Sequence, residues 1–122
     1  MVPNTIHNTP NIPYICIFSC NLLRSSSNFF TNQFLNKNIK CDFMLDDGPH
    51  SLESMKQFIK LYSQIMTDDG ILIIEDVQSW DWIDILKNEV PEHLKQFIKT
   101  YDLRPNKNRD DDIVFTIDKF NI

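Results

Sequence analysis

The sequence predicts an α/β fold in which a βαβ unit precedes a C-terminal antiparallel pair of strands. Short apolar runs at 39–45 and 71–74 flank a segment with helical periodicity, an order typical of parallel strands joined by a right-handed crossover. Two later strand-like runs are joined by a polar loop without a helix, which favours antiparallel pairing at a sheet edge. The 122 residues suffice for one domain with a buried core.

The first third of the chain has the weakest pattern. Its start is rich in proline and asparagine, which indicates turns, and residues 12–18 could form one short strand. Residues 24–28 are a serine-rich loop, and 29–35 could form a short amphipathic helix. These segments predict little regular structure before the βαβ unit.

From residue 39 the pattern becomes regular. The apolar run 39–45 ends at an Asp-Asp-Gly-Pro turn, as expected for a buried strand followed by a sharp turn. A helix is predicted over 52–66, because apolar residues recur there at steps of three and four and Ser51 is a suitable N-cap. The polar residues 67–70 are expected to end this helix before the second buried strand, 71–74.

The remaining elements complete the α/β pattern. Helices are predicted at 82–88 and 91–97, the second starting at a proline. Strands are predicted at 100–103 and 113–117, separated by the polar loop 104–112.

Glycine content excludes one class of site. The chain has two glycines, Gly48 and Gly70. The glycine-rich loops that cradle nucleotides need at least two glycines within six residues. A self-contained glycine-cradled nucleotide site is therefore excluded.

Charge and hydropathy bear on partners and location. All 17 acidic residues lie within 42–118, and a net charge of −5 argues against nucleic acid as the main partner. The longest apolar-leaning run, 12–23, is too short and too interrupted to span a bilayer. With no export signal evident, we expect no membrane partner and a cytoplasmic location. Cys16, Cys20 and Cys41 lack metal or redox spacing and are expected to be reduced and structural.

Acidic pairs follow both strands of the βαβ unit: Asp46-Asp47 and Glu75-Asp76. Ligands of parallel sheets bind beyond the carboxyl ends of the strands, which lie about 5 Å apart, so Asp47, Glu75 and Asp76 are predicted to converge. Clustered carboxylates repel one another unless a cation lies among them, and oxygen ligands suit Mg²⁺, Mn²⁺ or Ca²⁺. His50 would face the same space, and imidazole is suited to general-base catalysis.

Each part of this constellation has a simpler explanation. Asp-Asp-Gly-Pro is a good turn sequence by itself, Glu-Asp after a strand is often the start of a loop, and a single His is more often a cap or a surface residue. Trp80 and Trp82 could flank a pocket or cover the core. The coincidence of acids at two adjacent strand ends with a His on the same side favours a site.

Three motifs point to a family: 46–53 (DDGPHSLE), 70–76 (GILIIED), and Arg109 followed by Asp111-Asp112-Ile113. Together they resemble the second half of class I S-adenosylmethionine-dependent methyltransferases. The nearest branch is similar to the metal-dependent sugar O-methyltransferases related to macrocin and mycinamicin O-methyltransferases and to cephalosporin hydroxylase-like proteins. The resemblance covers roughly residues 34–119.

The resemblance implies a partial Rossmann-like methyltransferase sheet. It also implies that Asp47, Glu75 and Asp76 bind Mg²⁺ or a similar divalent cation and that His50 is catalytic. The implied reaction is transfer of a methyl group from S-adenosylmethionine to a hydroxyl of a sugar or related small molecule, whose proton His50 removes.

The cofactor half of the family is not matched. Residues 24–30 stand where the family has its glycine-rich cofactor loop, and they contain no glycine and no acid. We therefore predict an atypical segment over 1–33 and a methyltransferase-like α/β half-domain over 34–122, with the first strands and the glycine-rich loop missing or replaced. The alternative is a truncated, catalytically inactive remnant or a metal-binding or interaction module. Missing strands would leave the strand 41–45 with an unpaired edge, so we expect self-association.

Overall fold

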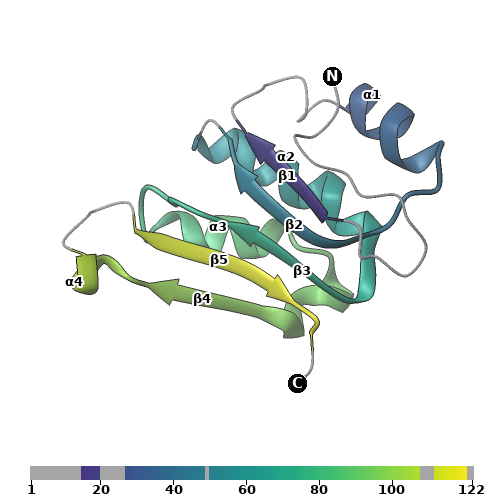
Figure 1. The fold of residues 1–122 in the computed structure, drawn as a ribbon. Coiled ribbons are helices and arrows are strands. Elements are labelled where there is room, and N and C mark those ends of the chain that lie inside the picture. The colour runs from purple at the N-terminus through teal and green to yellow at the C-terminus, as the bar shows by residue number, and fades with distance from the viewer. Residues whose placement is uncertain (1–14, 20–26, 49, 108–111, 121–122) are drawn as a thin grey trace.

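The computed structural model describes residues 15–19, 27–48, 50–107 and 112–120. They form an α/β fold with a five-stranded mixed sheet in the order β1-β2-β3-β5-β4, which confirms the predicted fold class (Figure 1). The strands are β1 Ile15–Ser19, β2 Cys41–Asp47, β3 Met66–Ile74, β4 Ile98–Asp102 and β5 Ile113–Asp118. The helical segments are α1 Ser27–Phe30 with η2 Thr31–Leu35, α2 Leu52–Tyr62 with η3 Ser63–Ile65, α3 Trp82–Glu89, η4 Glu92–Phe97 and α4 Arg104–Lys107.

Strand directions confirm both parts of the predicted topology. β1, β2 and β3 pair in parallel, and α2 connects β2 to β3. β5 is antiparallel to β3 and to β4, so β4 runs in the same direction as β3. The carboxyl ends of β1 to β4 therefore lie at one edge of the sheet, where β5 begins (Figure 1). We call this the carboxyl edge.

The prediction that the strand 41–45 has an unpaired edge is wrong. β1 pairs with β2 from Ile15 opposite Phe43 to Ser19 opposite Asp47, so the short strand predicted near 12–18 exists and covers that edge. Within the described part of the chain, the two outer strands are β1 and β4. Self-association stays a prediction, but the strand edge on which it was based is occupied.

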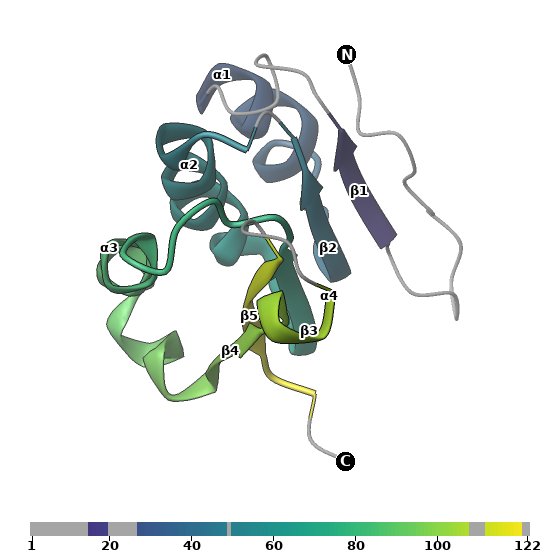
Figure 2. The ribbon, with the colours of Figure 1, turned by 90° about the vertical axis from the view of Figure 1, so that its left-hand side faces the viewer.

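The helices α1, α2 and α3 lie on one face of the sheet (Figure 2). Side chains alternate between the two faces of a strand, and those on the helical side form the core with the helices. The buried strand residues on that side are Met44, Leu72, Ile74, Ile113, Phe115 and Ile117. Their neighbours along the strands are only half-buried and do not belong to the core cluster; these are Phe43, Leu45, Ile71, Ile73 and Val114.

α2 follows directly from its sequence. The Ser51 hydroxyl accepts a hydrogen bond from the Ser54 backbone N–H at 3.2 Å, as predicted for the N-cap. Met55, Phe58, Ile59, Leu61 and Tyr62 are buried in this helix. The helix therefore packs one apolar face on the sheet and begins at the carboxyl edge.

The segment 67–70 behaves differently from its prediction. It belongs to β3 rather than to a helix end, and it bulges from the ladder, because Cys41 pairs with Met66 while Phe43 pairs with Ile71. The Thr67 hydroxyl donates a hydrogen bond of 2.8 Å to Asp42, the β2 residue opposite the bulge. Four polar residues can thus lie within a strand when they form a bulge and one of them hydrogen-bonds to a side chain of the partner strand.

Smaller differences concern the C-terminal half and the cysteines. The predicted helix 91–97 is the 3-10 helix η4, and the predicted loop after β4 starts with the single turn α4. Cys16 and Cys41 are buried free thiols, and a hydrogen bond between them, together with burial, raises the pKa of Cys41. Cys20 lies outside the described residues. No helix in the described part of the chain has the length and apolar character needed to span a membrane.

Candidate metal centre

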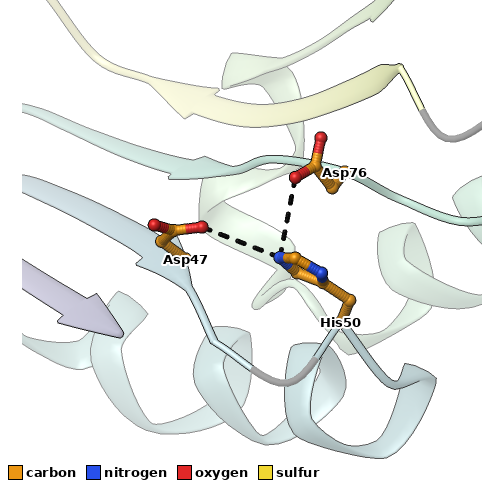
Figure 3. A group of neighbouring side chains, drawn as sticks. All are labelled: Asp47, His50 and Asp76. Carbon is orange, nitrogen blue, oxygen red and sulfur yellow. Dashed lines mark ion pairs between the residues drawn. The ribbon is translucent and has the colours of Figure 1, made fainter. Parts of the chain in front are cut away.

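Three predicted site residues meet at the carboxyl edge. Asp47 is the last residue of β2, and His50 follows it in the turn that leads to α2. Asp76 lies two residues beyond the end of β3, the parallel neighbour of β2. Figure 3 shows their side chains directed toward one another.

The ligand atoms of these residues lie close together. His50 Nε2 is 3.7 Å from Asp47 Oδ1 and 3.6 Å from Asp76 Oδ2, and all three ligand atoms lie within 4.8 Å of one another. The exposed fractions of the side chains are 54% for Asp47, 32% for His50 and 26% for Asp76. The cluster is therefore formed by the fold and still open to a ligand from solvent.

The backbone adopts an unfavourable conformation at two of these residues. His50 has φ 58° and Asp76 has φ 55°, and the only other non-glycine residue with positive φ in the described segments is Asn38. The left-handed region costs a non-glycine residue on the order of 1–3 kcal/mol, less for Asp and Asn, and such residues concentrate at functional sites. The fold therefore holds two of the three side chains in a backbone conformation that lowers its stability.

Asp46 lies buried beside the cluster. Its Oδ1 accepts a hydrogen bond of 2.9 Å from the Gly48 backbone N–H. Burial raises the pKa of Asp46 from 3.8 to about 6, although the hydrogen bond from Gly48 and the nearby His50 act in the opposite direction. A Cβ atom at position 48 would lie 2.7 Å from the same oxygen, so a larger residue there would displace the buried Asp46 carboxylate.

The two carboxylates fit a divalent cation, with the imidazole beside it. A cation bound at about 2.0–2.2 Å from each ligand separates its ligand atoms by roughly 3–4.3 Å, and the carboxylate oxygens of Asp47 and Asp76 lie within 4.8 Å of each other. His50 Nε2 is a buried atom that makes no hydrogen bond with any described residue. Two carboxylates beside an imidazole suit Mn²⁺, Fe²⁺ or Zn²⁺ as well as Mg²⁺.

Glu75 is the predicted ligand that does not join this group. The cluster of ligand atoms contains Asp47, His50 and Asp76, so an imidazole stands where the third carboxylate was expected. Successive residues of an extended chain point to opposite sides, and the left-handed turn at Asp76 is not visible in the sequence. The ligand role of Glu75 stays a prediction.

Two residues contribute to the centre beyond those predicted from the sequence. Asp46 is buried whereas Asp47 is exposed, a difference that alternation along β2 signals. Gly48 is not only a turn residue, because its backbone N–H donates a hydrogen bond to Asp46. Of the third motif, Arg109 and Asp111 lie outside the described residues, and Asp112 is buried beside the start of β5.

The raised pKa of Asp46 predicts how stability depends on pH. Between pH 3.8 and about 6 the folded protein holds a proton that the unfolded chain has released, so the free energy of unfolding falls as pH rises through this range. Asp46→Asn should remove this slope and raise stability at pH 7 by about 2–3 kcal/mol without divalent cations. Urea unfolding in EDTA at several pH values measures the free energy of unfolding of both proteins. If the free energy of the wild type rises from pH 4 to pH 6 in parallel with that of the variant, the pKa of Asp46 is not raised.

Comparisons with known proteins give no match: no family model, no curated protein and no solved structure is similar to the chain. The resemblance to methyltransferases in 46–53 and 70–76 therefore stays a prediction based on those motifs. The arrangement of Asp47, His50 and Asp76 at the carboxyl edge does not depend on that resemblance, and a function can be proposed from it.

Proposed function

We propose that the chain binds one divalent cation at Asp47 and Asp76, with His50 as a general base beside it, and that it acts on a hydroxyl group of a small molecule. The observation that supports this most is the convergence of the three side chains at the ends of neighbouring parallel strands. Two of them are held there by left-handed backbone. Non-glycine residues with this backbone conformation concentrate at functional sites.

The residues have separate tasks in this proposal. Asp47 and Asp76 would hold the cation, with Glu75 as a third ligand by resemblance. When bound, the cation supplies Lewis acidity, which lowers the pKa of a coordinated hydroxyl. His50 Nε2 accepts the hydroxyl proton, and the carboxylates at 3.6 and 3.7 Å stabilise the resulting imidazolium.

The methyltransferase proposal extends this chemistry. The motifs 46–53 and 70–76 resemble those of S-adenosylmethionine-dependent sugar O-methyltransferases, which makes a sugar or related hydroxyl compound the proposed acceptor and a Rossmann-like sheet the proposed family fold. The order of the motifs at adjacent strand ends supports it. The chain offers no glycine-rich loop to hold S-adenosylmethionine, because both glycines lie elsewhere in the sequence.

The second candidate function is a cation-binding module without methyl transfer. It is favoured by one observation: the sequence between β1 and α1 contains no glycine and no acid. Both candidates share the cation centre, so they differ only in whether S-adenosylmethionine binds.

Calorimetric titration with Mn²⁺ tests the shared centre. We expect one site per chain in the wild type, affinity lower by about 100-fold or more in Asp47→Asn, and unchanged affinity in Asp84→Asn, an exposed acid on α3. His50→Gln should lower the affinity less than about ten-fold, because His50 acts as a base. Wild-type affinity in Asp47→Asn would refute the centre, and a loss in His50→Gln as large as in Asp47→Asn would make His50 a ligand instead.

Titration of the Mn²⁺-loaded protein with S-adenosylmethionine and S-adenosylhomocysteine separates the two candidates. Binding of either compound supports the methyltransferase proposal. No heat at millimolar concentrations contradicts it and favours the cation-binding module.

A further inference from the structure

An exposed aromatic residue at the carboxyl edge lies beside a positively charged arginine side chain. Trp80 is 42% exposed, and the guanidinium carbon of Arg104 lies 5.9 Å from the centre of its ring. Trp82, two residues later, packs against the hydrophobic core instead. Of the two tryptophans, Trp80 is therefore the one available to a ligand.

Arg104 is fixed in position by its neighbour. Its Nε and Nη2 atoms each donate a hydrogen bond of 2.8 Å to the carboxylate of Asp102, and its backbone N–H donates to the same group at 3.2 Å. These bonds lower the pKa of Asp102, so the carboxylate stays charged. A guanidinium held by two parallel bonds is preorganised, and it orients the face of Trp80 that it contacts.

The pair lies at the same edge as the metal centre. Val77, next to Asp76, donates a backbone hydrogen bond of 3.1 Å to Ile113 at the start of β5. Leu103, next to Arg104, donates one of 2.9 Å to Asp112. β3 and β4 are separated only by β5, so the chain segments that carry Asp76 and Arg104 leave the sheet roughly 10 Å apart, two strand spacings.

We infer that Trp80 and Arg104 form the second half of a binding site that begins at the cation, and that this site takes a ligand with a flat ring and an oxyanion, such as a nucleoside monophosphate. The ring stacks on Trp80, and the oxyanion reaches the cation, because a divalent ion held by carboxylates commonly takes phosphate oxygens as its remaining ligands. The inference rests on the cation centre proposed above.

Charge makes binding conditional on the cation. Asp47, Asp76 and Asp102 all lie at this edge and repel an oxyanion, and Arg104 is already paired with Asp102. A bound divalent ion neutralises the two carboxylates of the metal centre and accepts oxygen ligands from the oxyanion. We therefore expect no binding of the ligand in EDTA.

Calorimetry with AMP, ribose 5-phosphate and adenosine on the Mn²⁺-loaded protein tests the inference. AMP should bind about ten-fold or more tightly than ribose 5-phosphate, which lacks the flat ring, and than adenosine, which lacks the oxyanion. Trp80→Ala should reduce AMP affinity to that of ribose 5-phosphate, and Trp80→Phe should restore most of it. Phe120→Ala, at an aromatic residue with a similar exposed fraction of 47%, should change nothing.

The outcomes separate this inference from the proposed function. If Mn²⁺ binds but AMP and ribose 5-phosphate bind equally, or Trp80→Ala keeps wild-type AMP affinity, the inference is wrong and the cation centre stands. If Mn²⁺ does not bind, both are wrong. Equal binding of AMP with and without EDTA also overturns the inference, because the oxyanion then does not use the cation.

Discussion

Replacing Asp76 by glycine is expected to weaken Mn²⁺ binding by about 100-fold or more while leaving the protein as stable as the wild type or up to about 1 kcal/mol more stable. Asp76 supplies a carboxylate to the cluster and has φ 55°, a conformation that glycine adopts without strain. Its removal also relieves repulsion from Asp47. Calorimetric titration measures the affinity, and urea unfolding in EDTA measures the stability.

Asn38→Gly is the matched control, because Asn38 also has φ 55° but lies in the turn before β2, at the opposite end of that strand. It should show the same small gain in stability and keep wild-type Mn²⁺ affinity. If Asp76→Gly destabilises the protein by more than about 1 kcal/mol, the side chain has a structural role that outweighs its strain. If its Mn²⁺ affinity equals that of the wild type, Asp76 is not a ligand.

Phe30→Ala is expected to lower the free energy of unfolding by about 3–5 kcal/mol, a large part of the 5–15 kcal/mol typical of a domain. Phe30 is 1% exposed, with its ring 4.9 Å from that of Tyr62 and 5.9 Å from that of Phe34. It lies in the segment 1–33 that the sequence sets apart from the half-domain. A large loss on mutation would show that this segment belongs to the same folding unit.

Leu35→Ala is the control for this prediction, because Leu35 ends the adjoining helical segment η2 but is 45% exposed. It should cost no more than about 0.5 kcal/mol. Urea unfolding followed by circular dichroism measures both variants. A cost below about 1 kcal/mol for Phe30→Ala would mean that α1 is not needed to complete the core.

The βαβ unit was predictable because its signals are local. The apolar runs before Asp46 and Glu75 are short and end at acidic residues, as is typical of buried strands, and α2 has apolar residues at steps of three and four. The pairing of β1 with β2 was not predictable, because β1 follows a proline-rich segment and the stretch that joins it to β2 has no clear helical periodicity. The bulge at 67–70 depends on a hydrogen bond from Thr67 to Asp42 across the strands, which no local pattern reveals.

The candidate site was predictable to the level of which residues meet, but not how they are arranged. Parallel pairing of β2 and β3 brings Asp47 and Asp76 together, and the three-residue step to His50 keeps it on the same side. The left-handed backbone at His50 and Asp76 decides which atoms converge, and it leaves Glu75 outside the cluster. Such conformations are imposed by tertiary contacts, and the enrichment of Asp and His in this region is too weak a signal to predict them at a given position.

The proposed function and the proposed ligand site both depend on a divalent cation at the carboxyl edge. Anomalous diffraction from crystals of the protein grown with Mn²⁺ tests this most directly. We predict one strong peak per chain, within about 2.5 Å of a carboxylate oxygen of both Asp47 and Asp76 and beside His50 Nε2. Peaks only at other acidic residues, or none at this edge with Mn²⁺ at millimolar concentration, would contradict the account.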